Sequence, residues 1–268
     1  MALSDHIINP KVRNRILILD VERLPGITRQ YWWDRGDLKN RYIHYETVER
    51  QPRTTLVCAK WYDSPDVIQL AEWDKGGRKK FLREVHRLLS SADICVTHNG
   101  DAADLPWLKG DLHIEAGLPP LPPFKSVDTL KILRREFKSG APFKGLDAFC
   151  QIVGIQAKTD RYDRDAMERA VAGSKEDQER LSLYCVGDVL AQQGLYDFLR
   201  PHIKGHPALF VDGKDKMTVC HRCGHDTKPI ARRYVANLLT YSMRLCTKCR
   251  AYSRISIDPQ RESIVRGV

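Results

Sequence analysis

Two carboxylic acids close to a short apolar run near the start of the chain constrain the fold more than any other feature. The segment Arg15–Asp20 reads RILILD, which is typical of a buried strand with Asp20 at its exit. Side chains two apart on a strand point to the same face, so Asp20 and Glu22 can share one cation. Like charges at the edge of a buried sheet are costly, and a metal ion is a reasonable partner for them. The pair therefore predicts a cation site at a sheet edge; a solvated strand end is the alternative.

The segments that follow alternate between strand and helix patterns. Thr55–Tyr62 and Val67–Trp73 are rich in β-branched and aromatic residues on either side of a turn, which predicts a hairpin. Lys79–Leu89 carries apolar residues at helical spacing, and Ile94–Thr97 is another short apolar strand. Three more helical patterns follow, at Thr129–Phe137, Leu146–Val153 and roughly Lys175–Leu199. Strand, hairpin, helix and strand in this order indicate an α/β fold.

Length and charge divide the chain into two parts. A chain of 268 residues fits one substantial core with a small satellite, and we expect a main domain over residues 1–205 and a module over residues 214–268. Residues 1–199 carry 30 Lys and Arg against 29 Asp and Glu, whereas residues 200–268 carry 14 against 5. A basic segment beside an acidic site favours nucleic acid as the partner. A solvated basic tail is the alternative.

Four of the eight cysteines form two Cys-x2-Cys pairs. Cys220 and Cys223 are followed, after 22 residues, by Cys246 and Cys249, which is typical of a zinc ribbon. One structural Zn2+ would supply most of the folding free energy of this module, because little apolar sequence is available there. Disulfides are the alternative, but the other four cysteines stand singly in apolar segments, as in a reducing compartment. No apolar leader is visible, so we expect a soluble, cytoplasmic protein.

A second acidic motif lies at Val96–Leu108, which reads VTHNGDAADLPWL. It resembles the second motif of the DnaQ-like 3′–5′ exonucleases, which have an RNase H fold, in the form His-Asn-x4-Asp-h-Pro-aromatic-h, where h is apolar. Asp104 matches the metal-binding aspartate of that motif, whereas Asp101 falls at a variable position. Ser126–Thr129 and Leu146–Ile155 are similar to segments between the second and third motifs. The resemblance implies an RNase H-like mixed sheet flanked by helices, with the four-cysteine module appended.

Tyr184 and Asp188 complete the set of polar residues. Residues four apart lie on one face of a helix, so the phenol and the carboxylate can converge on one site. In third position after the two earlier motifs, this pair resembles the tyrosine (DEDDy) subgroup of the same family. The resemblance covers about residues 15 to 200, and the order of the motifs is most similar to that of phage-encoded members.

The resemblance implies a hydrolytic site with two Mg2+ or Mn2+ ions. Asp20, Glu22 and Asp188 would hold one ion. Asp20 would also bridge to the second ion, which Asp104 would support. Two cations about 4 Å apart can bind a phosphodiester and stabilise its leaving oxygen. Tyr184 would orient the attacking water, because a phenol with a pKa near 10 is a poor general base. The family releases nucleoside 5′-monophosphates from a 3′ end.

Two further groups are candidates for substrate contacts. His98 and Asn99 either position the substrate or brace the end of their strand. The long connection Pro25–Thr54 includes Trp32 and Trp33 among several cations. Aromatic rings stack on unpaired bases, so this insert either contacts a single strand or anchors a long loop onto the core.

The basic residues around the cysteine pairs include Arg232 and Arg233, and we expect them to grip the backbone of DNA or RNA. Docking to a polymerase or another replication protein is the alternative role of the module. The sequence favours a metal-dependent exonuclease that acts on single-stranded 3′ ends, with DNA preferred to RNA because of the phage-like resemblance. An exoribonuclease is the closest rival. A catalytically inactive nucleic-acid-binding replication accessory protein is a rival from another class.

Overall fold

The structure is a computed structural model of the 268-residue chain. It describes residues 8, 11–31, 43–137, 145–155, 163–236, 239–257 and 265–267. The predictions for Trp32 and Trp33 therefore lie outside the described residues.

A mixed five-stranded sheet forms the centre of the larger part. Its strands are β1 (Ile16–Leu24), β4 (Arg53–Trp61), β5 (Val67–Ala71), β6 (Ile94–Thr97) and β7 (Lys125–Asp128). They lie in the order β5-β4-β1-β6-β7. β4 runs antiparallel to both β1 and β5, whereas β1, β6 and β7 are parallel. The predicted hairpin is present as β4 and β5, and the sheet has the mixed arrangement expected of an RNase H-like fold.

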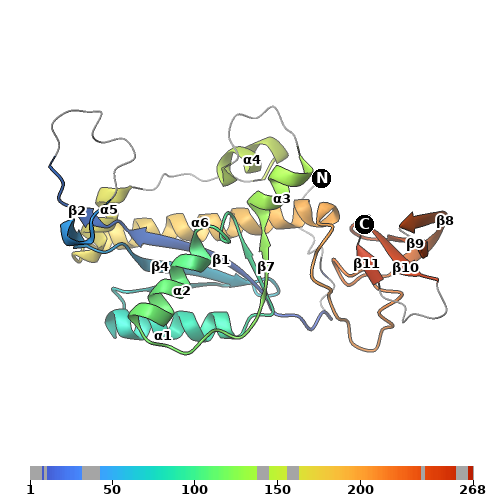
Figure 1. Cartoon of the computed structure of the whole chain (residues 1–268), viewed down its shortest axis with the longest axis horizontal. Helices are drawn as coiled ribbons and strands as arrows, with labels where there is room; N and C mark the ends of the chain where they lie inside the picture. Colours follow the sequence, from blue (N-terminus) through green and yellow to red (C-terminus); the bar gives the residue numbers. More distant parts are fainter. Residues whose placement is uncertain are drawn as a thin grey trace.

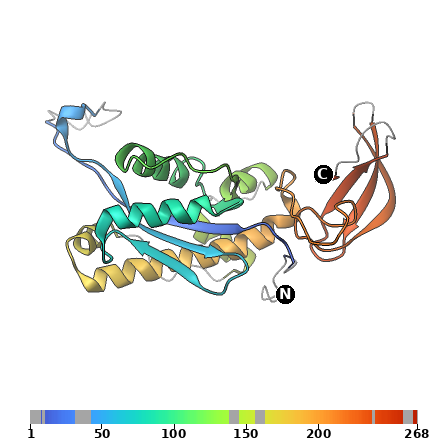
Figure 2. The same cartoon turned by 90° about the horizontal axis from the view of Figure 1, so that it is seen from below.

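Helices cover both faces of this sheet (Figure 1, Figure 2). α1 (Gly77–Ser90) and α2 (Asp104–Lys109) lie on one face, and the long helix α6 (Lys175–Leu199) crosses the other. A π-helical turn at Gly110–Glu115 continues α2. Three shorter helices contribute buried residues to the cluster on the α6 side: α3 (Thr129–Glu136), α4 (Leu146–Val153) and α5 (Arg164–Val171). The predicted α/β architecture is confirmed.

The residues of β1 alternate between the two faces, as the period of a strand requires. Leu17, Leu19 and Val21 pack in the apolar cluster with α1 and α2. Ile16, Ile18 and Leu24 pack in the apolar cluster with α6. Asp20 and Glu22 share the parity of the second set, so the sheet presents both acids to α6.

β1 continues beyond the acids, so the prediction that Asp20 stands at the strand exit is wrong. The parallel pairing with β6 ends at Ile18, opposite Val96, but the antiparallel pairing with β4 continues to Leu24. The register with β4 shifts between Glu22 and Arg23, where β4 has one extra residue. Such bulges occur often beside functional sites, because they re-aim side chains. Both acids therefore lie just past the carboxyl end of the parallel pairing.

A short antiparallel ribbon follows β1. β2 (Ile27–Thr28) pairs with β3 (Val48–Arg50), next to a 3-10 turn at Tyr45–Thr47. The Arg50 guanidinium anchors the ribbon, because it pairs with Glu168 of α5 and donates to the backbone oxygen of Pro25.

The C-terminal part forms a second sheet, at one end of the molecule (Figure 1). Its strands are β8 (Thr227–Ala236), β9 (Leu239–Cys246), β10 (Tyr252–Ser256) and β11 (Val265–Gly267). They are antiparallel and lie in the order β11-β10-β9-β8. The chain leaves α6 through a 3-10 turn at Arg200–His202 before it enters this part. Among the described residues, no helix has both the length and the apolar character needed to cross a membrane.

Candidate active site

Asp20 and Glu22 form a compact group with a residue of α6. One ligand atom from each of Asp20, Glu22 and Cys185 lies within 4.8 Å of the others. The Cys185 thiol is buried, and its Sγ lies 3.5 Å from Oδ2 of Asp20. The same sulfur lies 3.8 Å from the backbone oxygen of Asp20, so α6 packs directly on this part of β1. Sequence reasoning missed Cys185, although it lies three residues before Asp188 and so on the same helical face.

Asp188 and Tyr184 lie on the same length of α6. Asp188 is only 4% exposed, and Tyr184 is partly buried. Because Cys185 contacts Asp20, the next helical turn brings Asp188 to the same side of β1. Asp188 is not a member of the group of three whose ligand atoms lie within 4.8 Å.

Asp104 approaches from the other side of the sheet. It is the first residue of α2 and is 7% exposed. Burial, and to a smaller extent the negative charge of Asp128, raise the pKa of Asp104 to about 7, while Arg23 acts in the opposite direction. Asp104 also stands outside the group that Asp20 and Glu22 form with Cys185. The structure thus places two acids on one side of the end of β1 and the third near its other side.

The donor set fits a divalent cation. Carboxylate oxygens are the ligands that Mg2+ and Mn2+ prefer, and Asp20 and Glu22 offer two of them on one face. The raised pKa of Asp104 reflects a buried carboxyl that would gain from a nearby positive charge. Cys185 adds a softer sulfur donor to the same group.

The turn after β6 is held by hydrogen bonds to the side chains of Asp128 and Thr129. Asn99 adopts a left-handed conformation, with φ of 66°. Its backbone N–H donates to Oδ1 of Asp128 across 2.9 Å, and the N–H of Asp101 donates to Oδ2 across 3.3 Å. Nδ1 of His98 lies 2.9 Å from Oγ1 of Thr129. These contacts fix the turn that precedes α2 and therefore the position of Asp104.

The four cysteines of the C-terminal part form one buried cluster. Cys220 and Cys223 come from the first pair, and Cys246 and Cys249 come from the second. All four are buried, and their four sulfur atoms lie within 4.8 Å of one another. All eight cysteines of the chain are free thiols, so the disulfide alternative does not hold in this structure. The backbone N–H of Gly224, which has φ of 72°, donates to the oxygen of Cys220 across 2.8 Å. Four sulfurs in this arrangement are compatible with a tetrahedral zinc site.

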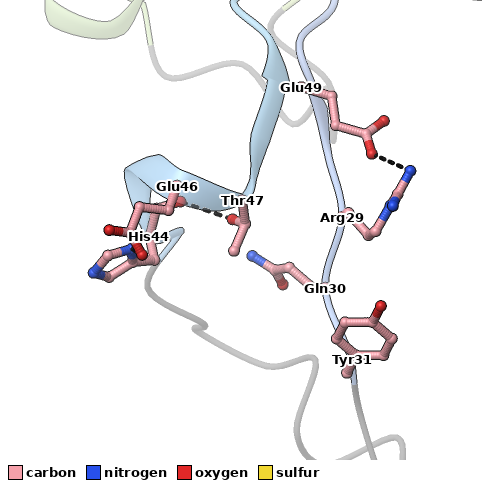
Figure 3. Close-up of a pocket in the computed structure, with 7 residues that line it drawn as sticks. All are labelled: Arg29, Gln30, Tyr31, His44, Glu46, Thr47 and Glu49. Atoms are coloured by element: carbon pink, nitrogen blue, oxygen red, sulfur yellow. Dashed lines mark hydrogen bonds and ion pairs between the residues drawn. The ribbon is translucent and has the colours of Figure 1, made fainter.

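One predicted contact surface and one pocket lie outside the acid site. Arg232 and Arg233 are exposed on β8. A pocket of about 480 Å3 opens on the β2–β3 ribbon (Figure 3). Its lining consists of Arg29, Gln30, Tyr31, His44, Glu46, Thr47 and Glu49. Arg29 pairs with Glu49 across 2.7 Å at its rim, as the dashed line in Figure 3 marks.

Comparisons with known proteins add three similar structures. No family model and no curated protein matches the chain. The family B DNA polymerase of the archaeon Pyrobaculum calidifontis is 15% identical, with a TM-score of 0.49 over 70% of this chain and 25% of the polymerase. RNase D of Trypanosoma brucei is 15% identical, with a TM-score of 0.42 over 70% of this chain and 58% of RNase D. Its complex with RNA U12 gives 15% identity and a TM-score of 0.43 over 70% and 56%. The chain thus spans a quarter of the polymerase and just over half of RNase D.

Proposed function

We propose that the protein is a metal-dependent 3′–5′ exonuclease that hydrolyses DNA and releases nucleoside 5′-monophosphates. The observation that carries this proposal is the placement of the acids around the end of β1. Asp20 and Glu22 face α6 on one side, and the buried Asp104 begins α2 on the other. These acids belong to motifs that resemble those of the DnaQ-like exonucleases, in the same order along the chain.

The side chains of this chain have distinct roles in the proposal. Asp20, Glu22 and Asp188 hold one cation, and Asp104 supports a second. Two such cations, when bound, supply the charge that activates water and stabilises the leaving oxygen. Tyr184 orients the water by a hydrogen bond rather than removing its proton, because an ordinary phenol is a weak base near neutral pH.

A gel assay with 3′- and 5′-labelled single-stranded DNA and RNA tests this function. The protein is incubated with Mg2+, Mn2+ or EDTA, beside the variants Asp20→Ala and Asp188→Ala. We expect metal-dependent, stepwise shortening from the 3′ end, at least 100-fold slower in both variants. Tyr184→Phe should lower the rate less than either acid variant. Shortening from the 5′ end, or activity that survives both acid substitutions, would overturn the proposal. Faster cleavage of RNA than of a matched DNA would assign an exoribonuclease.

In this proposal, the four-cysteine module binds one zinc ion and contacts the nucleic-acid backbone. Arg232 and Arg233 are exposed on β8, whereas Arg222 is buried against the end of α6. Removing the whole module would disturb α6, so surface substitutions are the cleaner test. The double variant Arg232→Ala/Arg233→Ala should bind DNA more weakly. The slope of log K against log salt concentration should fall by the amount expected for the loss of about two phosphate contacts.

A matched double substitution on the main domain controls for the loss of charge alone. Lys79→Ala/Lys80→Ala removes two exposed cations from α1, and we expect it to leave the salt dependence unchanged. If the β8 and α1 variants bind alike, the module does not grip the backbone, and docking to another protein becomes its expected role.

A further inference from the structure

The partly buried Arg23 and the exposed Trp107 form a cation–π pair next to the proposed acids. Cζ of Arg23 lies 4.7 Å from the centroid of the Trp107 ring. Trp107 remains 43% exposed, although it is one of the largest apolar side chains in the main domain. Single exposed apolar residues are common, so the exposure alone has little meaning. The position of the pair is what points to a role.

The elements that carry the acids also place this pair. Arg23 directly follows Glu22 on β1 and so points to the opposite face, toward α2. Trp107 lies three residues after Asp104 on α2, on the same helical face. A strand of nucleic acid bound at the acids therefore has an aromatic surface within its immediate surroundings.

The guanidinium of Arg23 lies in a polar setting. The charges of Asp111 and Asp104 attract it, and the charge of Arg78 repels it. Asp111 is itself held, because its Oδ2 accepts the backbone N–H of Thr54 across 2.9 Å and lies 3.9 Å from Nη2 of Arg78. The cation–π contact keeps the guanidinium against one face of the indole and so restrains the orientation of the ring.

We propose that Trp107 stacks on an unpaired nucleobase near the 3′ end of a single strand, while Arg23 holds the indole ring. This inference rests on the proposed nuclease function, since it places the base one helical turn from the acid Asp104. An indole stacks on any base, because every base presents a π-face. Trp107 thus confers a preference for unpaired ends without a preference for sequence. The terminal base of an intact duplex is held in its base pair and must unpair, at a cost in free energy, before it can turn onto the ring. A duplex end therefore gains less from Trp107 than an unpaired end does.

Binding of oligonucleotides that contain one abasic site tests the proposal without turnover. Fluorescence anisotropy is measured with 5′-labelled single-stranded DNA in the absence of added Mg2+ and Mn2+, with the abasic site moved through the last few 3′ positions. At one position, the missing base should weaken binding to the unsubstituted protein at least 10-fold. Trp107→Ala should weaken binding of the intact strand by the same factor. An abasic site at that position should then weaken binding to Trp107→Ala no further. Trp107→Phe should retain most of the affinity.

Ile114→Ala is the matched control, because Ile114 is 88% exposed in the turn that continues α2. It should bind as tightly as the unsubstituted protein, and a thermal melt should show that the variants are folded. An abasic penalty that persists in Trp107→Ala, or unchanged affinity of that variant, would overturn the stacking role and leave the exonuclease proposal intact. Conversely, a Trp107-dependent abasic effect in a protein that cleaves nothing would overturn the exonuclease proposal alone.

Discussion

Arg200 donates a hydrogen bond from Nη1 to the backbone oxygen of Arg222, across 3.0 Å. Arg200 directly follows α6, and Arg222 lies between Cys220 and Cys223 of the four-cysteine cluster. Arg222 in turn donates to the backbone oxygen of Pro201. Both guanidinium side chains are almost completely buried. The four-cysteine cluster is therefore packed directly against the end of the helix that carries the proposed catalytic residues.

Loss of the four-cysteine cluster should destabilise the C-terminal end of α6. Burial alone would lower the pKa of Arg200, but Tyr196 and Asp197 raise it above its ordinary value, so this buried charge depends on its partners. If the four-cysteine module holds the proposed zinc ion, a chelator or Cys220→Ser should unfold the module and remove the backbone acceptor of Arg222. We expect this loss to destabilise the main domain by about 1–3 kcal/mol and to speed amide hydrogen exchange at Tyr196 and Leu199. Thermal unfolding and hydrogen exchange measure both effects.

Arg232→Ala controls for an unspecific effect of altering the module, because Arg232 is exposed on β8. Its melting curve and its exchange rates in α6 should match those of the unsubstituted protein. Unchanged exchange in α6 after metal removal would show that the two parts of the chain fold independently.

Asp104 should make the metal-free protein less stable as the pH rises. Its pKa is raised from 3.8 to about 7, first by burial and then by Asp128, so the folded state binds a proton that the unfolded state has already lost. Between about pH 4 and pH 7 this difference lowers the free energy of unfolding, by an amount of the order of 4 kcal/mol. Asp104→Asn should remove this part of the pH dependence of stability. Added Mg2+ should restore stability to the unsubstituted protein at pH 8.

Urea unfolding at pH 5 and pH 8 without added divalent cations measures the effect as a difference between the two proteins. The comparison cancels the opposite contribution of His206, whose pKa is lowered mainly by burial and which therefore favours folding as the pH rises. Equal pH dependence in Asp104→Asn and in the unsubstituted protein would contradict this account of Asp104.

Asp128→Asn should weaken the turn after β6 and lower the pKa of Asp104. Oδ1 of Asp128 accepts the backbone N–H of Leu130 across 3.0 Å as the N-cap of α3, in addition to its bonds to the turn. An amide in place of the carboxylate loses one acceptor atom and the negative charge, at a cost of about 1–2 kcal/mol in stability. NMR titration of the Asp104 carboxyl should show its midpoint at a lower pH.

Asp163→Asn is the matched control, because Asp163 caps α5 through the N–H groups of Asp165 and Ala166. It should cost a similar cap energy while the titration of Asp104 stays unchanged. An equal shift of the Asp104 midpoint in both variants would show that the effect comes from general destabilisation rather than from the charge of Asp128.

The parts of the fold that follow from local periodicity were predictable from the sequence. The period of two along β1 places Asp20 and Glu22 on one face, and the α/β order follows from the lengths of the apolar segments. The pairing with β4 that extends β1 to Leu24 was not predictable, because it depends on the register with a strand about 30 residues away.

The parts of the site that depend on helix packing could not be read from the sequence. Cys185 meets Asp20 only because α6 crosses β1 at that level. Arg23 meets Trp107 because consecutive residues of β1 face opposite helices. The buried contact between Arg200 and the cysteine cluster likewise joins segments that no local pattern connects. For Cys185 a signal existed in its spacing from Asp188, but three-residue spacings are common in any helix.

Gly100→Ala should disrupt the turn that places Asp104. A Cβ at position 100 would lie 2.3 Å from both Cβ and Oγ1 of the buried Thr97, so the turn or the end of β6 must shift. We expect a loss of about 3 kcal/mol in the free energy of unfolding by urea, together with weaker Mg2+ binding by calorimetry. Gly110→Ala is the matched control, because a Cβ there meets nothing within 4 Å and the backbone is already helical, with φ of −59°. That substitution should be neutral or should stabilise the protein by up to about 1 kcal/mol. If both variants unfold at the same urea concentration, the close approach of Gly100 to Thr97 does not constrain the turn.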